Sequence, residues 1–379
     1  MPTRTYGFDP AHVPPSSPLA GHYAARIARG EAVAGALQDL KAEGFHPDLV
    51  IGHGGWGETL FVKDVWPAAR LLLHAELCYA AEGGDVGFDP EFPSPDPMAA
   101  RLRARTRNTA MLHALLDSDG AVAPTRWQAD SFPAVLRPRI SVVHEGIDTD
   151  LVRPDPGASV TLRREGVTLR PGDEVVTFVA RNLEPYRGYH VFMRALPTIL
   201  ARRPNARAVI VGGDGVSYGA APPAGTTWRQ RFLDEVAGRL DMTRVHFVGH
   251  VPHPVFVRLM QVSAAHVYLT YPFVLSWSVL EAMSAGALVV GSRTPPVEEV
   301  VEDGRNGILG GFFDVDGIAD AVTEVLATPE RFAPLRIAAR CTVVERFDLR
   351  RVCLPAWLRL VKADTHSIGS SSLGRVAAE

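Results

Sequence analysis

The sequence predicts an α/β protein with two doubly wound, parallel-sheet domains of the Rossmann type. Its 379 residues, 46% of them apolar, are enough for two separate cores. In both halves of the chain, short apolar runs that end in Gly, His or Pro alternate with helical stretches. The runs are apolar throughout, as expected for strands of parallel sheets that helices cover on both faces.

The first half begins with a proline-rich segment and then alternates. The prolines before residue 19 exclude an opening helix, and apolar residues recur at helical spacing from Leu19 to Phe45. The strands expected after this helix are 48–53, 70–74, 120–124 and 140–144. Alternation of strands and helices of this kind predicts a parallel sheet.

The second half repeats the alternation after a polar break at residues 153–159. Its expected strands are 174–180, 207–212, 244–249, 266–271 and 287–291. Its expected helices are 189–203, 228–240, 253–262 and 278–285. Ligands of open α/β sheets bind beyond the carboxyl ends of the strands, so we expect the functional residues there, in a cleft between the two domains.

The order of these elements predicts four segments along the chain. They are a first domain at 1–152, a second domain at 153–345, a C-terminal helix at 346–364 that crosses back to the first domain, and a tail at 365–379. The tail is rich in small and polar residues, which is typical of disorder.

The composition excludes several function classes. The formal net charge is −3 and no basic stripe is interleaved with aromatics, so nucleic acid is not expected as a partner. Cys78, Cys341 and Cys353 lack metal-ligand spacing, so neither a disulfide framework nor a zinc site is expected. No apolar run reaches the ~18 residues of a membrane span, and the chain does not open like a signal peptide. These features indicate a cytoplasmic protein, and the scarcity of lysine indicates a GC-rich bacterial genome.

Two arginines follow the first strand of the second half. Residues 178–191 read FVARNLEPYRGYHV, with Arg181 at the strand end and Arg187 before the glycine that opens a helix. A guanidinium is always charged and binds phosphate oxygens bidentately, so the pair suits a diphosphate. The alternative is two solvated surface arginines. Gly212 and Gly213 end the next strand, where a ligand could approach the backbone, although many α/β strands end in this way.

Residues 269–291 (LTYPFVLSWSVLEAMSAGALVVG) join a strand to a helix that begins near Ser276. Free backbone amides and the positive end of the helix dipole would favour a phosphate at this start. Glu281, one turn further along, is placed to accept hydrogen bonds from vicinal hydroxyls such as those of ribose. A carboxylate that only complements the helix dipole is the alternative for Glu281 taken alone.

Four ordered blocks make the chain resemble the retaining GT-B glycosyltransferases of family 4. They are FVARNLEPYRG at 178–188, RAVIVGGDG at 207–215, VHFVGHV at 245–251 and LEAMSAGALVVGSRTPPVEEVVEDGRNGIL at 280–309. They are similar to the family's G-R-x-x-x-x-K-G, strand-glycine turn, F-x-G strand and L-E-A-M … E-x-V-x-D-G-x-N-G ending. VVHEGIDTDLVRP at 142–154 is similar to its interdomain I-P-N-G-V-D … F-x-P. The resemblance covers roughly residues 45–362.

The resemblance implies a metal-independent transferase that moves a sugar from a UDP- or GDP-linked donor to an acceptor with retention of anomeric configuration, and no cofactor. Arg181 and Arg187 would hold the diphosphate, and Glu281 the ribose. The backbone at His250 and Val251 would contact the base. The donor segment before and at the helix start would contact phosphate and sugar, and comprises Phe273, Val274, Leu275, Ser276, Trp277 and Ser278.

Three departures from the family pattern are present. Arg187 replaces a lysine, which keeps the charge and changes its geometry. Phe273 replaces the first glutamate of the family's E-x-seven-E pair, the carboxylate that normally contacts the donor sugar. Residues 1–47 contain no strand with a glycine-rich turn, so the N-terminal sheet is expected to lack its first strand, either because the true start lies upstream or because the strand is lost.

The strand ends of the first half supply candidates for the acceptor side. The loop within VIGHGGWGET contributes His53, Gly54, Gly55, Trp56 and Glu58. The next strand ends in His74 and Glu76. The family's N-domain histidine, which reaches the donor sugar, most nearly matches His74. A structural role at a strand end is the alternative for each of these side chains.

Other functions fit the same architecture. A phosphorylase would need a pyridoxal-type lysine, and the only lysine after position 63 is Lys362, in the last helix. A nucleotide-sugar epimerase remains an alternative, as does a nucleotide-sugar-binding protein that has lost catalysis, which Phe273 and the missing strand would explain. Pocket selectivity depends on side-chain geometry, so the base, the sugar and the acceptor (small molecule, glycan or lipid-linked) are open at this point, as are the oligomeric state and any peripheral contact with the inner membrane face.

Overall fold

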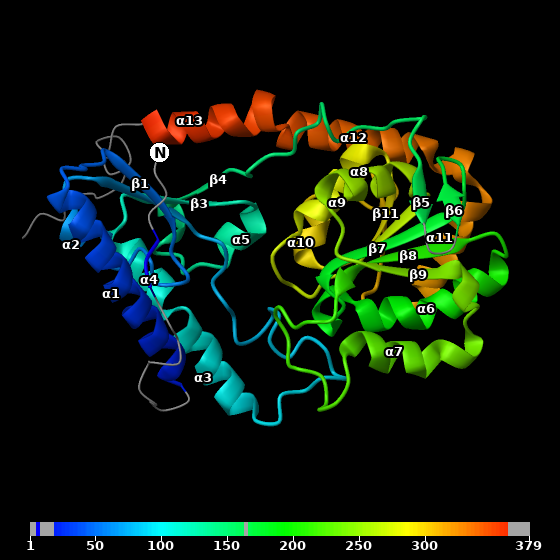
Figure 1. The fold of residues 1–379 in the computed structure, drawn as a ribbon, viewed down its shortest axis with the longest axis horizontal. Helices are drawn as coiled ribbons and strands as arrows, with labels where there is room; N and C mark the ends of the chain where they lie inside the picture. Colours follow the sequence, from blue (N-terminus) through cyan, green and yellow to red (C-terminus); the bar gives the residue numbers. More distant parts are fainter. Residues whose placement is uncertain (1–4, 8–18, 163–165, 363–379) are drawn as a thin grey trace, which may run out of the picture. The chain divides into compact units, whose positions relative to one another are not determined.

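The structure, a computed structural model, describes residues 5–7, 19–162 and 166–362 (Figure 1). The chain divides into two compact units. Unit 1 contains the residues up to His144 together with those from Leu354 onward, and unit 2 is Glu145–Cys353. Residues 145–152, expected in the first domain, therefore group with unit 2, and the expected tail lies outside the described residues. No helix in the described part of the chain is both long and apolar enough to cross a membrane.

Unit 1 holds a four-stranded parallel sheet in the order β1-β2-β3-β4. The strands are β1 (Leu49–His53), β2 (Arg70–His74), β3 (Gly120–Ala123) and β4 (Ile140–Val142). The helices are α1 (Gly21–Ala42), α2 (Val62–Val65), α3 (Pro97–Arg107), α4 (Thr109–Asp117), α5 (Arg126–Asp130) and α13 (Leu354–Lys362). The predicted strands of the first half are confirmed. Among residues 5–7 and 19–48, α1 forms and no strand does.

The strands of unit 1 are buried because both of their faces are covered. Leu71, Leu72 and Leu73 of β2 are each at most 2% exposed, although successive side chains of a strand point to opposite faces. A continuous apolar run is therefore the correct pattern for this strand, as the sequence indicated. Helix α13 is tied to the same unit: Trp357 Nε1 donates to the carbonyl of His144 at 3.2 Å, and Arg70 donates to the carbonyl of Val361 at 2.9 Å.

Unit 2 holds a six-stranded sheet in the order β12-β11-β10-β7-β8-β9, all of whose pairs are parallel. Its strands are β7 (Val175–Asn182), β8 (Arg207–Gly213), β9 (Val245–Gly249), β10 (Ala265–Tyr268), β11 (Leu288–Ser292) and β12 (Ile308–Gly310). This is the doubly wound order, in which the chain runs outward from β7 in one direction and from β10 in the other. The five strands predicted for the second half are confirmed.

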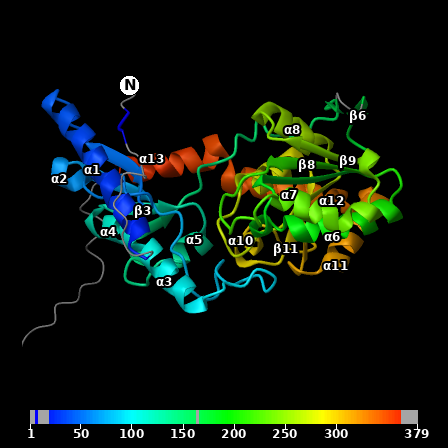
Figure 2. The ribbon, with the colours of Figure 1, turned by 60° about the horizontal axis from the view of Figure 1, so that its bottom comes forward.

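The helices of unit 2 cover both faces of this sheet. They are α6 (Tyr189–Arg202), α7 (Trp228–Val236), α8 (His253–Val262), α9 (Trp277–Ala285), α10 (Pro295–Glu298), α11 (Val315–Ala327) and α12 (Ala333–Phe347). Helices α6 and α7 lie on one face, and α8 and α9 lie on the other (Figures 1 and 2). Helices α11 and α12, strand β12 and a short antiparallel hairpin of β5 (Val160–Leu162) and β6 (Val167–Leu169) were not among the predicted elements.

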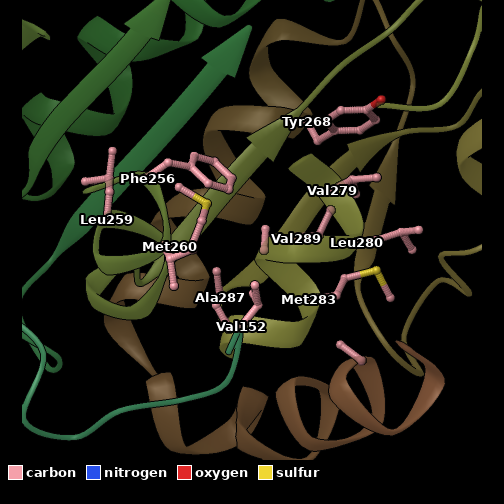
Figure 3. Packing of buried hydrophobic residues seen from close by; sticks show 14 of the residues in the cluster. Val152, Phe256, Leu259, Met260, Tyr268, Val279, Leu280, Met283, Ala287 and Val289 are labelled. Atoms are coloured by element: carbon pink, nitrogen blue, oxygen red, sulfur yellow. The ribbon is translucent and has the colours of Figure 1, made fainter. Parts of the chain in front are cut away.

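The core beneath α8 and α9 fixes the position of the α9 start. Met260 of α8 and Met283 of α9 are both fully buried, and they belong to one cluster with Val289 of strand β11 (Figure 3). Val279 and Leu280, near the N-terminus of α9, belong to the same cluster and are 0% exposed. Burial of such side chains is worth roughly 1.5–3 kcal/mol each, so the first turn of α9 is firmly held.

Candidate functional site

Two strands at the centre of the unit 2 sheet lead into the candidate site. Strands β7 and β10 pair in parallel through Val176 and Ala265, although the chain leaves them toward opposite edges of the sheet. We call the carboxyl ends of these two strands the switch point. The connections that follow β7 and β10 diverge there, which leaves a crevice in which open α/β sheets bind their ligands.

Arg187 lies on the tight turn between β7 and α6. The turn is a 3-10 helix, Pro185–Arg187, and is followed by Gly188 with a φ of 70°. A Cβ atom at Gly188 would lie 2.3 Å from the Cβ of Leu269, the residue after β10. Only glycine satisfies both the backbone angle and the close approach, so the turn packs directly against the end of β10.

The side chain of Arg187 is almost fully buried at the switch point. It is 7% exposed, and its Nη1 donates to Oγ1 of Thr270 at 2.9 Å and to the carbonyl of Val274 at 3.0 Å. The hydroxyl of Tyr268 lies 3.4 Å from the same nitrogen. These bonds fix the guanidinium, while Nε and Nη2 donate to no residue that the structure describes.

Aromatic rings, and no acidic side chain, surround the Arg187 charge. Its guanidinium carbon lies 5.3 Å from the ring centroid of Tyr218 and 5.6 Å from that of Phe273. Phe273 is 4% exposed and meets the ring of Tyr186 edge-on. No carboxylate among the described residues lies within 4.0 Å of Arg187. A buried cation without a counter-ion is costly, and an anionic ligand would supply the missing charge.

Arg181 and His250 meet through the backbone. The side chain of Arg181, near the end of β7, is exposed, whereas its carbonyl accepts a hydrogen bond from His250 Nε2 at 2.7 Å. Because a carbonyl cannot donate, Nε2 carries the proton and the tautomer of His250 is fixed. The structure thus joins the β7 end to the β9–α8 loop, where His250 and Val251 were expected to contact a base.

Two side chains that the sequence did not single out organise the loop after β8. Glu184 is 0% exposed, and its carboxylate accepts from the backbone amides of Ser217, Tyr218 and Gly219 at 3.2–3.3 Å. Asn182 accepts from the amide of Gly215 at 3.1 Å and donates to the hydroxyl of Ser217 at 2.7 Å. Together they hold Tyr218 beside Arg187.

Protein packing explains the glycine pair at the end of β8. A Cβ atom at Gly213 would lie 2.6 Å from Cε1 of His250 and 2.7 Å from Oδ1 of Asn182. A Cβ atom at Gly212 would lie 2.8 Å from the carbonyl oxygen of Ala180. The space that the glycines leave is thus occupied by the neighbouring side chains and backbone of unit 2 itself.

The start of α9 is bonded to the same strand ends. Ser276 caps the helix by accepting from the amide of Ser278 at 3.3 Å, and its own amide donates to the hydroxyl of Tyr268 at 2.8 Å. Trp277 is 52% exposed, whereas Leu275 is 8% exposed. Tyr268 therefore links the positive end of α9 to the Arg187 site, and both favour an anion between them.

Glu281 lies one turn along α9 and is paired with a residue from α8. Its Oε1 accepts from Nε2 of His253 at 2.6 Å. The side chain of Glu281 is 14% exposed and that of His253 is 51% exposed. Burial raises the pKa of Glu281 above its ordinary value, and the hydrogen bond and charge of His253 offset part of this rise. The carboxylate is held in place without a ligand.

In unit 1, His53 and His74 end neighbouring strands in register and their rings stack with centroids 5.5 Å apart. Nδ1 of His53 accepts from the amide of Gly55 at 3.1 Å, and Nε2 faces Oε2 of Glu76 at 3.2 Å. Since Nδ1 accepts, Nε2 carries the proton and donates to Glu76. The structure brings these three predicted side chains together at one edge of the sheet.

Other candidates of the first half face different partners. Glu58 accepts from Arg29 of α1 at 3.1 Å and from the hydroxyl of Tyr6 at 3.2 Å. A Cβ atom at Gly54 would lie 2.7 Å from the sulfur of Met111, so this glycine is required by packing. Trp56 is 50% exposed, with its ring 6.0 Å from that of His53.

Two family models match the chain along most of its length. Residues 2–152 match the model of the glycosyl transferase family 4 group, and residues 162–340 match the model of glycosyl transferases group 1. The chain belongs to the family 4 glycosyltransferases. The predicted resemblance is thereby confirmed.

Curated relatives of this glycosyltransferase are named as a mannosyltransferase and as an inositol phosphate glycosyltransferase. It is 29% identical over 292 residues to the GDP-mannose-dependent alpha-(1-6)-phosphatidylinositol monomannoside mannosyltransferase of Mycolicibacterium smegmatis, covering 75% of this chain and 69% of the relative. It is 26% identical over 308 residues to the D-inositol 3-phosphate glycosyltransferase of Streptomyces scabiei, covering 78% of this chain and 63% of the relative. This chain is accordingly a hexosyltransferase-type glycosyltransferase.

Solved structures show the GT-B fold for this glycosyltransferase. Anabaena HepE, in complex with UDP and glucose, matches with a TM-score of 0.63 and 18% identity, over 93% of this chain and 85% of that chain. Sucrose-phosphate synthase from Thermosynechococcus elongatus matches with a TM-score of 0.64 and 18% identity, over 93% and 81%. At this identity the likeness shows the fold alone, and the predicted fold class is confirmed.

Proposed function

We propose that this family 4 glycosyltransferase moves a hexose from a UDP- or GDP-linked sugar to an acceptor hydroxyl, with retention of anomeric configuration and without a metal ion. The observation that carries the proposal is the environment of the Arg187 guanidinium. Its guanidinium is buried at the switch point, fixed through Nη1, and not paired with any described carboxylate. Nε and Nη2 are then available to the oxygens of a diphosphate, and Arg181 adds a second guanidinium from the same connection.

The chemistry needs positive charge where the leaving group forms. The bond between the anomeric carbon and the phosphate oxygen breaks, the acceptor oxygen bonds to the same carbon, and the proton of the acceptor hydroxyl passes to the leaving phosphate oxygen. Negative charge grows on the diphosphate during this step. Arg187 and the start of α9 are held in place before the reaction, and one preorganised donor of this kind is worth about 3 kcal/mol in the transition state.

The remaining donor contacts follow from the same arrangement. Glu281 is fixed by His253 and would accept hydrogen bonds from the ribose hydroxyls. The β9–α8 loop around His250 would contact the base. The Mycolicibacterium smegmatis relative is named as GDP-mannose-dependent and HepE was solved with UDP, which supports a nucleotide sugar as donor. In the described residues, no three His, Cys, Asp or Glu side chains gather as a metal site would require.

Product analysis tests the reaction itself. The protein is incubated with UDP- and GDP-hexoses and a panel of polyol acceptors, with and without EDTA, and the anomeric proton of the product is read by NMR. We expect a product with the donor's anomeric configuration and an unchanged rate in EDTA. An inverted product would contradict retention, and loss of activity in EDTA would contradict metal independence.

A protein that binds the donor without transfer is the second candidate, and Phe273 favours it. This apolar side chain stands where the family carries a carboxylate for the donor sugar. Nucleotide-sugar binding with neither transfer nor slow donor hydrolysis would replace the transferase proposal by this candidate.

A further inference from the structure

A charged pocket, separate from the site around Arg187, lies within unit 1 near the N-terminal part of α1. Its polar lining is Arg26, His53, Glu76, Tyr79, Arg107 and Asn108. The space inside is about 30 Å³, which is room for a compact group. The proposed donor site around Arg187 lies in unit 2 and shares no residue with this pocket.

Arg26 of α1 reaches this pocket without a partner. Its Nη1 is buried and has no hydrogen-bond acceptor among the described residues. Burial lowers the pKa of the Arg26 guanidinium, and the neighbouring charge of Arg107 lowers it further. Arg29, one turn along the same helix, is instead paired with Glu58 at 3.1 Å. Arg29 is thus neutralised by an ion pair, whereas Arg26 is not, within the part of the chain that the structure describes.

Arg107, the last residue of α3, is held over the pocket by an aromatic ring. Its guanidinium carbon lies 4.0 Å from the ring centroid of Tyr79, and no described carboxylate lies within 4.0 Å of it. Asn108 fixes Tyr79 by accepting from its amide and donating to its carbonyl, each at 2.8 Å. The support for Arg107 is therefore built into the fold.

The charges of the pocket do not balance. Glu76 is the acidic side chain of the lining, and its carboxylate accepts from Nε2 of His53. His53 is neutral in this arrangement because its Nδ1 accepts from the amide of Gly55. Among the side chains that line the pocket, two guanidiniums thus face one carboxylate, which leaves an excess positive charge in the lining of a partly buried space. Such an excess is costly unless an anion binds there.

We infer that this pocket binds a phosphate group of the acceptor substrate, with Arg26 and Arg107 as its ligands. The inference rests on the proposed function and on the expectation from the sequence that the first half of the chain binds the acceptor. Two guanidiniums can offer parallel donors to a tetrahedral oxyanion, and a phosphate fits a space of this size. The acceptor is then a phosphate-bearing polyol, and its hydroxyl, not its phosphate, accepts the sugar.

Calorimetric titration of the full chain with inorganic phosphate and with glycerol 3-phosphate tests the inference, with glycerol as the neutral probe. We expect both phosphates to bind and glycerol not to bind. Arg26→Gln and Arg107→Gln should each weaken binding at least tenfold. Arg103→Gln, on the exposed side of α3, is the matched control and should leave binding unchanged. Vesicles with phosphatidylinositol replace glycerol 3-phosphate in a parallel titration, and binding to vesicles alone would assign the phosphate to a lipid headgroup.

Three comparisons distinguish phosphate binding in this pocket from binding at the donor site and from a structural role of Arg26. If Arg187→Met abolishes phosphate binding and Arg26→Gln does not, phosphate binds at the donor site and the inference fails. If Arg26→Gln lowers the melting temperature of the ligand-free protein, the side chain is structural and the inference fails, since removal of an unpaired buried charge should not destabilise the fold. If the protein binds nucleotides but not phosphate, the phosphate pocket is ruled out and the transferase proposal stands. If it binds phosphate but no nucleotide, the transferase proposal fails and the phosphate site stands.

Discussion

The Nη1 atom of Arg187 and the hydroxyl of Thr270 are hydrogen-bonded at 2.9 Å, although the two residues follow different strands. Arg187 lies after β7 and Thr270 after β10, so the bond spans the switch point. The guanidinium is therefore oriented before any ligand arrives. Donors that need no reorganisation during the reaction are the ones that stabilise developing charge best.

Arg187→Met should lower kcat by about a hundredfold, because one fixed donor to the leaving diphosphate is lost. The kcat of Arg187→Lys should lie between those of the wild type and Arg187→Met, since lysine keeps the charge but not the bidentate geometry. Steady-state kinetics with the identified donor measures both. Arg239→Met, at an exposed position of unit 2, is the control and should have the wild-type rate. Equal rates for Arg187→Met and the control would remove Arg187 from the mechanism.

Gly188→Ala should destabilise the protein far more than Gly225→Ala. Both glycines have positive φ, 70° and 81°, so both substitutions carry a backbone cost of about 1–2 kcal/mol. Only at Gly188 would the new Cβ meet Leu269, whereas nothing lies within 4 Å of a Cβ at Gly225. The clash should add roughly 1–3 kcal/mol. Urea unfolding of the two variants measures the difference, and equal losses would mean that the turn is not packed on β10.

Glu184→Gln should loosen the loop after β8. The three amides of residues 217–219 would face one amide oxygen in place of a carboxylate, and hydrogen bonds to a charged group are worth about 2 kcal/mol. Hydrogen exchange should become faster at these amides and stay unchanged in β11. Glu330→Gln, an exposed change in unit 2, serves as the reference. Unaltered exchange at 217–219 would show that Glu184 does not hold the loop.

Glu281→Gln should stabilise the ligand-free protein at neutral pH and abolish nucleotide binding. Burial raises the pKa of Glu281 above its value in the unfolded chain. The protonated carboxyl, present below the unfolded pKa, is therefore compatible with folding, whereas the ionised carboxylate at higher pH lowers the stability of the folded protein. The gain of the variant should therefore be present at pH 7 and shrink toward zero below about pH 4, where both side chains are neutral. Melting temperatures across this range measure it. A variant that is less stable at pH 7 would contradict this role of burial at Glu281.

The sheet strands could be predicted because each one is marked by a local apolar run in the sequence. The apolar run expected at 207–212 is found as β8, Arg207–Gly213, since a strand covered on both faces must be apolar at every position. β12 and the β5–β6 hairpin were missed, because a strand of three residues is too short for a pattern of its own. β4 is as short, but it was predicted from the longer run expected at 140–144. The start of α9 was predicted within one residue, and the structure adds that Ser276 caps it.

The side chains that shape the site were harder to predict. Arg187 was singled out as a phosphate ligand, but its burial between Tyr218 and Phe273 depends on segments far apart in the sequence. Glu184 and Asn182 were not singled out, because their partners are amides of a loop more than thirty residues later. Gly212 and Gly213 were interpreted as room for a ligand, whereas protein atoms fill that room. Tertiary contacts of this kind leave no periodic signal.

Thermal shift with nucleoside diphosphates tests most directly whether Arg187 holds the donor. The wild type, Arg187→Met and Arg239→Met are melted with UDP, GDP, ADP and TDP and their sugar conjugates. A ligand at 100 times its dissociation constant adds about 2.7 kcal/mol of stability, which a melting curve resolves. We predict that a uridine or guanosine series raises the melting temperature of the wild type and of Arg239→Met but not of Arg187→Met. Equal shifts in all three proteins, or none in any of them, would contradict a donor site built on Arg187.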